Sequence, residues 1–176
     1  MSGRSSRAVE VAEVADEVDG SVVVDTSAWI EFLKSTGSAV HRRLVQAVES
    51  ETTIVVPEVV RMELLIGGTS EDWAVRRRRM LDTFDVEPAV PLVDSEAAAA
   101  IHRACRRGGE TVRNLLDCQV AATAIRMDLP VLHRDRDFDV IARHTRLRVL
   151  SISRTHQKGL ASRRPRGAMN VEIISA

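Results

Sequence analysis

The sequence predicts an α/β protein with a central, mostly parallel sheet that is covered by helices on both faces. Short runs of β-branched residues alternate with longer stretches of helical periodicity along most of the chain. These short runs are continuously apolar, as Val22–Val23–Val24 is, rather than alternating between apolar and polar residues. Continuous apolar strands are typical of parallel sheets that are buried on both faces.

The predicted elements follow one another in a regular order. They are a strand at 22–24, helices at 26–34 and 38–49, a strand at 53–56, helices at 58–66 and 70–82, a strand at 86–92, helices at 95–107 and 113–127, a strand at 130–133, a helix at 138–144 and a strand at 148–151. The helix at 26–34 places Trp29, Ile30 and Leu33 on one stripe, and core packing is the default expectation for them.

Glycine and proline mark several boundaries of these elements. Pro57 suits the first position of the helix that follows the second strand. Gly67–Gly68 and Gly108–Gly109 end two helices. Pro88 and Pro91 interrupt the strand predicted at 86–92, so its edges are the least defined in the chain.

Composition bounds the class of protein and its organisation. The 176 residues suffice for one domain, and 44% hydrophobic and 28% charged residues are typical of a globular protein. No apolar run reaches the roughly 18 residues of a membrane span, and residues 1–20 lack the apolar segment of a signal peptide. We therefore expect a cytoplasmic protein without membrane association. Residues 1–20 are predicted to be a flexible arm, 21–153 the folded domain and 154–176 a basic, disordered tail.

Two acids are predicted to lie at one edge of the sheet. Asp25 ends the first strand, and Asp135 follows the strand at 130–133 by two residues. Sites in open α/β sheets form beyond the carboxyl ends of the strands, where both acids would meet. An alternative for Asp25 is a helix cap for the helix at 26–34. Asp137 follows closely, and the spacing does not decide between Asp135 and Asp137, although Asp135 is nearer to the strand.

Two further acids lie beside apolar helix faces. Asp117 follows Leu116 in a helix with a buried stripe, and Glu63 lies among Val59, Val60, Leu64, Leu65 and Ile66. Burying a carboxylate costs several kcal/mol (about 3–5 when it is left unpaired) unless a cation or hydrogen bonds compensate it. An ion pair with Arg113 or Arg61 is the structural alternative for these two acids.

Taken together, the acids predict a metal site. Carboxylates that share one place repel each other unless a cation neutralises them. Mg²⁺ or Mn²⁺ suits a cluster of oxygen ligands, whereas no group of His and Cys has zinc spacing. His133 is interpreted as a strand-end histidine rather than a ligand. The predicted catalytic acids are Asp25, Glu63, Asp117, Asp135 and Asp137, and the predicted metal ligands are Asp25, Asp117, Glu63 and Asp135.

Basic residues would have to flank such an acidic pocket if it were to bind RNA. The formal net charge is zero, so bulk positive charge is excluded as the means of binding. The candidates are Arg76–Arg77–Arg78–Arg79, Arg103, Arg106, Arg107 and Arg113. The run of four arginines is equally well interpreted as a solvated helix face.

Four segments in order resemble the motifs of PIN domains. They are VVVDTS at 22–27, PEVVRMEL at 57–64, LDCQVAATA at 116–124 and DRDF at 135–138. The match spans about residues 22–150, and the short single-domain form is most similar to the VapC-type toxins of bacterial toxin–antitoxin pairs. His133 departs from the pattern, since these proteins commonly have Thr at that position.

The resemblance implies an α/β/α sandwich and a Mg²⁺- or Mn²⁺-dependent endoribonuclease that hydrolyses RNA phosphodiester bonds with a metal-activated water. It also implies a homodimer that is inhibited by a small VapB-type antitoxin. Asp25 and Asp117 would be the principal metal ligands, Glu63 with Asp135 or Asp137 would complete the pocket, and Thr26 or Ser27 would orient the first acid. The alternative is a catalytically inert PIN-like module that binds RNA or a protein.

Overall fold

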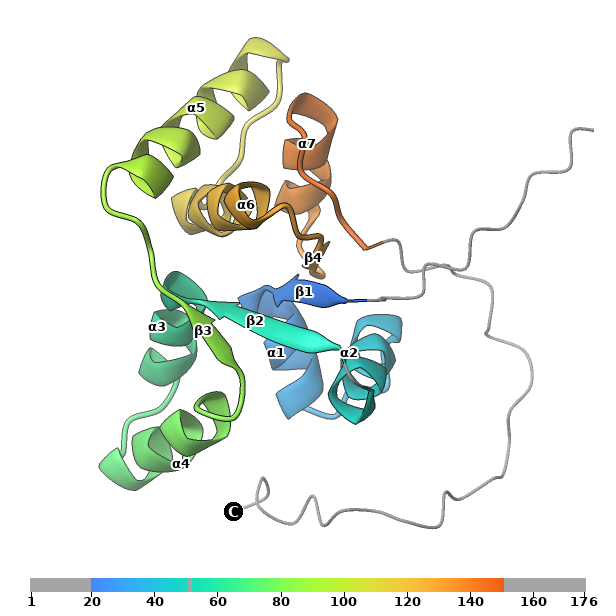
Figure 1. Ribbon diagram of the computed structural model, residues 1–176, viewed down its shortest axis with the longest axis vertical. Coiled ribbons are helices and arrows are strands. Elements are labelled where there is room, and N and C mark those ends of the chain that lie inside the picture. The colour runs from blue at the N-terminus through green and yellow to red at the C-terminus, as the bar shows by residue number, and fades with distance from the viewer. Residues whose placement is uncertain (1–19, 51, 151–176) are drawn as a thin grey trace, which may run out of the picture.

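The computed structural model describes residues 20–50 and 52–150, and it confirms the α/β fold (Figure 1). The elements in chain order are β1 (Ser21–Val24), α1 (Thr26–Leu33), α2 (Ala39–Glu49), β2 (Thr53–Pro57), α3 (Glu58–Ile66), α4 (Glu71–Leu81), β3 (Asp85–Glu87), α5 (Val93–Arg107), α6 (Leu115–Met127), β4 (Val131–Leu132) and α7 (Arg136–His144). Residues 1–19 of the arm predicted at 1–20, and the whole tail predicted at 154–176, lie outside the described residues.

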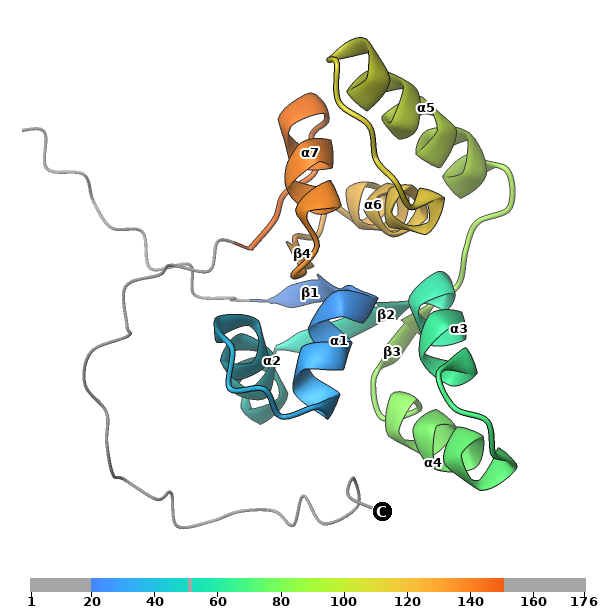
Figure 2. The same cartoon turned by 180° about the vertical axis from the view of Figure 1, so that it is seen from behind.

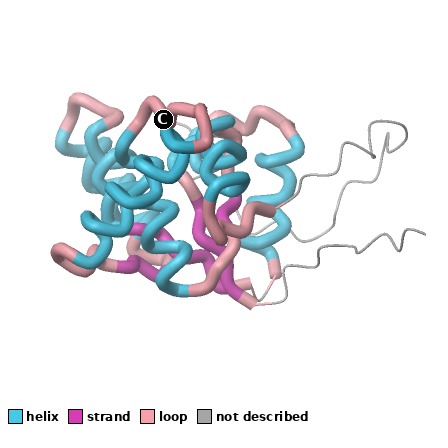
Figure 3. Tube along the Cα trace, turned by 90° about the horizontal axis from the view of Figure 1, so that it is seen from above, coloured by secondary structure: helices cyan, strands magenta, loops and turns pink. Residues whose placement is uncertain are grey.

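The four strands form one sheet in the order β3-β2-β1-β4, and every pairing is parallel. Figures 1 and 2 show α1 to α4 gathered on one side of the sheet and α5 to α7 on the other. This division follows from right-handed crossovers, because the chain moves one way from β1 to β3 and the opposite way to β4. Figure 3, seen from above, shows the short strands partly covered by helices.

The core is centred on β1. Val22, Val23 and Val24 have no exposed surface, and the large side chains of Trp29 and Phe138 are fully buried on the two sides of the sheet. Trp29 packs edge-on against Phe32, with ring centroids 5.9 Å apart. Core packing is therefore confirmed for the centre of the apolar α1 stripe, while Ile30 on the same helix remains 39% exposed.

The predicted strand at 86–92 was wrong in its length. β3 spans only Asp85–Glu87, and α5 begins at Val93 instead of Ser95. Pro88 and Pro91 carry no backbone N–H and cannot extend a strand ladder. The chain turns at Leu92, whose φ of 65° lies in the left-handed region.

Three further elements differ from the prediction by two residues or more. α6 begins at Leu115 because Asn114 caps it, and α7 begins at Arg136 because Asp135 caps it. The strand expected at 148–151 is a single parallel bridge between Val149 and Val131, and residue 151 lies outside the described part.

A buried ion cluster fastens the β3–α5 connection to the end of α6. Asp94 is 3% exposed, and its carboxylate accepts hydrogen bonds from Arg126 Nε at 2.9 Å and Nη2 at 3.0 Å. The Val90 backbone N–H donates to the same carboxylate at 2.8 Å. Arg126 also pairs with Glu87 at 2.7 Å.

Among residues 20–50 and 52–150, no helix has both the length and the apolar character of a membrane span.

Candidate metal centre

The predicted acids converge where the strand order reverses. β2 and β3 extend the sheet on one side of β1, and β4 pairs with its other side. Asp25 directly follows β1, and Asp135 comes three residues after the end of β4. Glu63 belongs to α3 on one face of the sheet, and Asp117 to the first turn of α6 on the other. Such a switch point is the usual place for a site in an open α/β sheet.

Asp25 is both a helix cap and a buried acid. Its Oδ2 accepts hydrogen bonds from the Ser27 backbone N–H at 2.8 Å and the Ser27 hydroxyl at 2.5 Å. The capping alternative is thus correct for this residue, yet only 4% of its surface is exposed. Burial raises the pKa of Asp25, and the hydrogen bonds from Ser27 oppose that rise.

Among the acids, Asp117 has the carboxylate whose burial is least compensated by hydrogen bonds or cations. It is 6% exposed, and the Asn114 side-chain amide donates a hydrogen bond of 3.1 Å to its Oδ1. Its Oδ2 is buried and has no hydrogen-bond partner among the described residues. Burial, followed by the charges of Asp25, Asp135, Asp137 and Glu63, raises the pKa of Asp117 to about 7.

No ion pair explains Asp117 or Glu63. Arg61 pairs instead with Asp82 at 2.7 Å, and the Arg113 guanidinium lies beside Asp137 at 3.5 Å and Asp135 at 3.9 Å. The structural alternative from the sequence is therefore wrong for both acids within the described part of the chain.

Glu63 is more exposed than its apolar neighbours predicted. It is half-buried on α3, and its Oε2 accepts a hydrogen bond of 2.5 Å from the Thr26 hydroxyl. Ser27 holds Asp25. The two adjacent hydroxyls thus serve two different acids, where either of them had been expected to orient the first.

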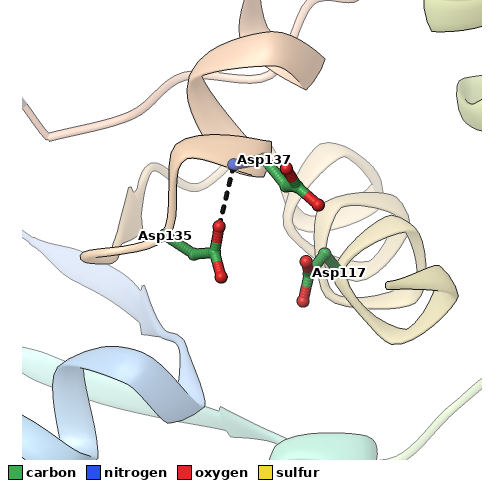
Figure 4. A group of neighbouring side chains, drawn as sticks. All are labelled: Asp117, Asp135 and Asp137. Carbon is green, nitrogen blue, oxygen red and sulfur yellow. Dashed lines mark hydrogen bonds between the residues drawn. The ribbon is translucent and has the colours of Figure 1, made fainter. Parts of the chain in front are cut away.

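Asp135 and Asp137 face Asp117 from the start of α7 (Figure 4). Asp135 is 42% exposed at its side chain, and its Oδ1 accepts a hydrogen bond of 3.0 Å from the Asp137 backbone N–H. Asp137 is 5% exposed, and its Oδ2 accepts a hydrogen bond of 2.8 Å from the Arg113 backbone N–H. Asp117, Asp135 and Asp137 each offer an oxygen atom, and the three atoms lie within 4.8 Å of one another.

These donors fit a hard divalent cation. All three close donors are carboxylate oxygens, the ligands that Mg²⁺ and Mn²⁺ prefer. The unpartnered Oδ2 of Asp117 lacks the compensation that a buried carboxylate needs, and a cation would supply it. Asp25 and Glu63 lie outside this closest group, but their charges act on Asp117.

Comparisons with known proteins agree with this geometry. The PIN domain family model matches residues 22–144. Ribonuclease VapC11 of Mycobacterium tuberculosis is 42% identical over 133 residues, which are 74% of this chain and 98% of that protein. The chain belongs to the VapC ribonucleases of the PIN-domain family. VapC ribonuclease Mb1587 of Mycobacterium bovis matches with the same identity and the same coverage.

Solved structures share the PIN fold with this VapC-family chain. The VapBC2 complex from Rickettsia felis, bound to a DNA fragment from its promoter, has a TM-score of 0.59 and 13% identity, covering 74% of this chain and 97% of that one. VapC20 of Mycobacterium tuberculosis, a sarcin–ricin loop cleaving toxin, has a TM-score of 0.52 and 20% identity, covering 72% and 98%. At these identities the likeness establishes the fold alone.

His133 of this PIN domain is a buried strand-end residue, as the sequence suggested. Its ring lies 5.0 Å from that of Phe138, and its Nε2 is 3.8 Å from Asp139. Burial lowers the pKa of His133, so the imidazole is neutral at neutral pH.

The predicted basic flank of this PIN domain lies in three places. Arg103, Arg106 and Arg107 belong to α5. Arg113 lies beside the acids with 76% of its side chain exposed. In the arginine run of α4, Arg77 instead packs over the ring of Trp73 at 4.9 Å.

Asn114 is a site residue that the sequence reading missed. It accepts a hydrogen bond from the Leu116 N–H as the cap of α6 and also donates to Asp117. The signal was present, since an Asn three residues before an acid at the start of an apolar helix is typical of a cap. Because the helix was expected to begin at Arg113, Asn114 was not recognised as its cap.

Proposed function

We propose that this chain is the endoribonuclease toxin of a toxin–antitoxin pair in the cytoplasm, and that it hydrolyses RNA phosphodiester bonds with Mg²⁺ or Mn²⁺. The observation that carries the proposal is the buried, unpartnered Oδ2 of Asp117 among four other carboxylates. The 42% identity to a protein named Ribonuclease VapC11 supports the same activity.

We assign the residues separate roles in this reaction. Asp117 and Asp25 hold the cation, together with Asp135, while Glu63 orients the attacking water; Asp137 supports Asp135 or completes the ligand set. A bound divalent ion would acidify that water and neutralise the charge that develops on the phosphate. Asp117, whose pKa is about 7 without the ion, must give up its proton before it binds as a carboxylate.

The hydroxyls of Thr26 and Ser27 keep two acids in place for this chemistry. Ser27 fixes one oxygen of Asp25, and Thr26 fixes one oxygen of Glu63, which leaves the second oxygen of each carboxylate for the ion or the water. Holding acids in fixed orientations is one way in which a protein supports metal-assisted hydrolysis.

A VapB-type antitoxin and a second copy of the chain are the proposed protein partners. Solved structures with this fold include toxin–antitoxin complexes from several bacteria. Helices α3 and α6, which carry Glu63 and Asp117, also expose large apolar side chains, as expected of interaction surfaces: Ile66 is 73% exposed and Leu115 63%. Light scattering on the purified chain should give the mass of a dimer, and a monomer would contradict this part of the proposal.

The test of the activity is cleavage of total cellular RNA with Mg²⁺, Mn²⁺ or EDTA, followed by mapping of the 5′ ends. We expect discrete cuts with the ions and none with EDTA. Asp25→Asn should abolish cleavage and keep the fold, because Asn also caps helices well. Asp128→Asn is the matched control, since Asp128 is 94% exposed and Asn tolerates its positive φ of 53°. A chain that cuts no RNA with either ion would instead be a binding module.

A further inference from the structure

Glu31 is a buried acid that the proposed reaction does not use. It lies on α1 with 8% of its surface exposed. Its Oε2 accepts a hydrogen bond of 2.5 Å from the Thr36 hydroxyl, and its Oε1 pairs with the Arg134 guanidinium. Hydrogen bonds from Ser38, Thr36 and Arg134 hold the pKa of Glu31 at about 2, so it is ionised at neutral pH.

Arg134 lies between β4 and α7, directly before Asp135. While its guanidinium reaches Glu31, its backbone N–H donates a hydrogen bond of 2.9 Å to the Ser27 hydroxyl oxygen. The same hydroxyl donates to Asp25 Oδ2 at 2.5 Å. Arg134 therefore connects to two of the acids, to Asp135 through the chain and to Asp25 through Ser27.

The connection through Arg134 opposes the charge repulsion between the acids. Oxygen atoms of Asp135 and Asp137 lie within 4.8 Å of one of Asp117, and like charges at such short range push their segments apart. The charge of Asp25 acts on Asp117 as well. The ion pair between Glu31 and Arg134 pulls the turn that carries Asp135 toward α1. The ion pair also holds the Arg134 backbone N–H in place as a donor to the Ser27 hydroxyl oxygen. The Ser27 hydroxyl proton is then directed toward Asp25.

We propose that Glu31 and Arg134 are positioning residues, an ion-pair latch that sets the separation of Asp25 and Asp135 for the metal. Neither side chain is among the close oxygen donors of the candidate metal centre. The latch acts on the ion only through Ser27, Asp25 and the turn at 133–135. This inference rests on the proposed metal-dependent function.

The structure supplies a matched control for the latch. Arg134 and Arg143 each pair with one glutamate, and their side chains are 56% and 54% exposed. Arg143 lies near the end of α7, whereas the acids lie at its beginning. A general loss of an ion pair should therefore affect both variants alike, and loss of the latch should affect Arg134 alone.

The experiment measures Mn²⁺ affinity by calorimetry on the full chain without RNA. We expect Arg134→Gln to weaken the Kd for Mn²⁺ about 10-fold or more, as residues that orient metal ligands commonly do. Arg143→Gln should leave the Kd unchanged, and Arg134→Lys should recover most of the loss, because it restores the cation. Glu31→Gln should match Arg134→Gln, and combining the two should add no further loss.

A second measurement follows hydrogen exchange of the Arg134 backbone N–H in the metal-free protein by NMR. We expect its protection to be lost in Glu31→Gln and retained in Arg143→Gln. A wild-type chain that binds no Mn²⁺ would overturn the proposed function, and the exchange data would still test the latch. A folded Arg134→Gln variant with wild-type Kd would overturn the latch alone, as would an equal loss in Arg143→Gln.

Discussion

The Asn114 side-chain amide holds one oxygen of Asp117 at 3.1 Å and leaves the other buried without a partner among the described residues. The same Asn114 caps α6 through its Oδ1 and the Leu116 N–H. A single side chain thus both begins the helix and aims the acid that this helix carries.

Asn114→Ala should reduce both stability and metal affinity. The lost cap should lower the free energy of unfolding by about 1 kcal/mol. Asn114→Ser is the control, because Ser caps as well as Asn but is too short to reach Asp117 in the same way. We expect Ser to restore the unfolding free energy, measured by urea denaturation, without restoring the Kd for Mn²⁺. Full recovery of both by Ser would show that Asn114 acts only as a cap.

The stability of the metal-free protein should fall as the pH rises. Folding raises the pKa of Asp117 from its ordinary 3.8 to about 7, so the folded state binds more protons than the unfolded chain between these values. Stability is lost with rising pH wherever the folded state binds more protons. For Asp117 the loss between about pH 5 and about pH 8 is about 2–3 kcal/mol, on the order expected for such a shift.

The measurement is urea unfolding in EDTA at both pH values for the wild type and Asp117→Asn. Burial lowers the pKa of His133, which acts in the opposite direction within the same range, so the difference between the two proteins isolates Asp117. We expect the wild type to lose more stability than Asp117→Asn. Equal losses would contradict a raised pKa for Asp117.

Adding a divalent cation should reverse this loss. A cation that binds only the folded state adds about 2.7 kcal/mol of stability at about 100 times its Kd. Thermal unfolding at about pH 8 should therefore move to higher temperature with Mn²⁺ and return with EDTA. Asp117→Asn should show little of this shift, while Asp128→Asn, at an exposed position, should behave as the wild type does. A shift of the same size in Asp117→Asn would show that Asp117 is not a ligand of the cation.

Arg126 should matter for stability more than surface arginines do. Arg126→Met leaves the carboxylate of Asp94 buried without its cation, at a cost of about 3 kcal/mol. Arg148→Met, which breaks an exposed pair with Asp128, should cost less than about 1 kcal/mol. Adding Asp94→Leu to Arg126→Met should recover part of the loss in urea unfolding. A double variant less stable than Arg126→Met would contradict the buried-charge explanation.

Arg113 should contribute a phosphate contact to RNA binding. Its side chain is 76% exposed and lies beside Asp135 and Asp137. Arg113→Ala should weaken RNA binding and lower the slope of log K against log salt by about 1. Arg148→Ala is the control, because Val149 pairs with Val131 at the start of β4 and so places Arg148 at the opposite edge of the sheet. The slopes come from binding to an inactive Asp25→Asn chain, and equal slopes for both variants would exclude this contact.

The sequence predicts the edge of the sheet at which the acids gather better than it predicts how they are held. Asp25 and Asp135 follow apolar strands, and parallel strands bring their carboxyl ends together whatever the details of packing. Asp117 is placed by the apolar stripe of its helix. The assignment of Thr26 to Glu63 and Ser27 to Asp25 depends on α3, which is distant in sequence, so no local pattern contains it.

Glu63 and the strand at 86–92 show a second limit. α3 is apolar on most sides, and the structure leaves Met62 48% and Ile66 73% exposed, so hydrophobicity alone does not identify the buried face. In the segment after Glu87, β-branched residues favour a strand, but Pro88 and Pro91 prevent its hydrogen bonds. Strand propensity favours a longer strand there, but the missing backbone hydrogen bonds end the strand at Glu87.

The hydroxyls of Thr26 and Ser27 at the start of α1 form hydrogen bonds with residues that are synthesised later. The pocket is therefore completed only late in chain synthesis. The bond from Thr26 to Glu63 joins residues 37 positions apart, and that from Arg134 to Ser27 joins residues 107 apart. Closing such long loops costs entropy that only the complete set of contacts repays. A nascent chain that has not yet released Arg134 from the ribosome lacks the hydrogen bond from Arg134 to Ser27, so we expect it to hold Asp25 less firmly and to cleave RNA poorly.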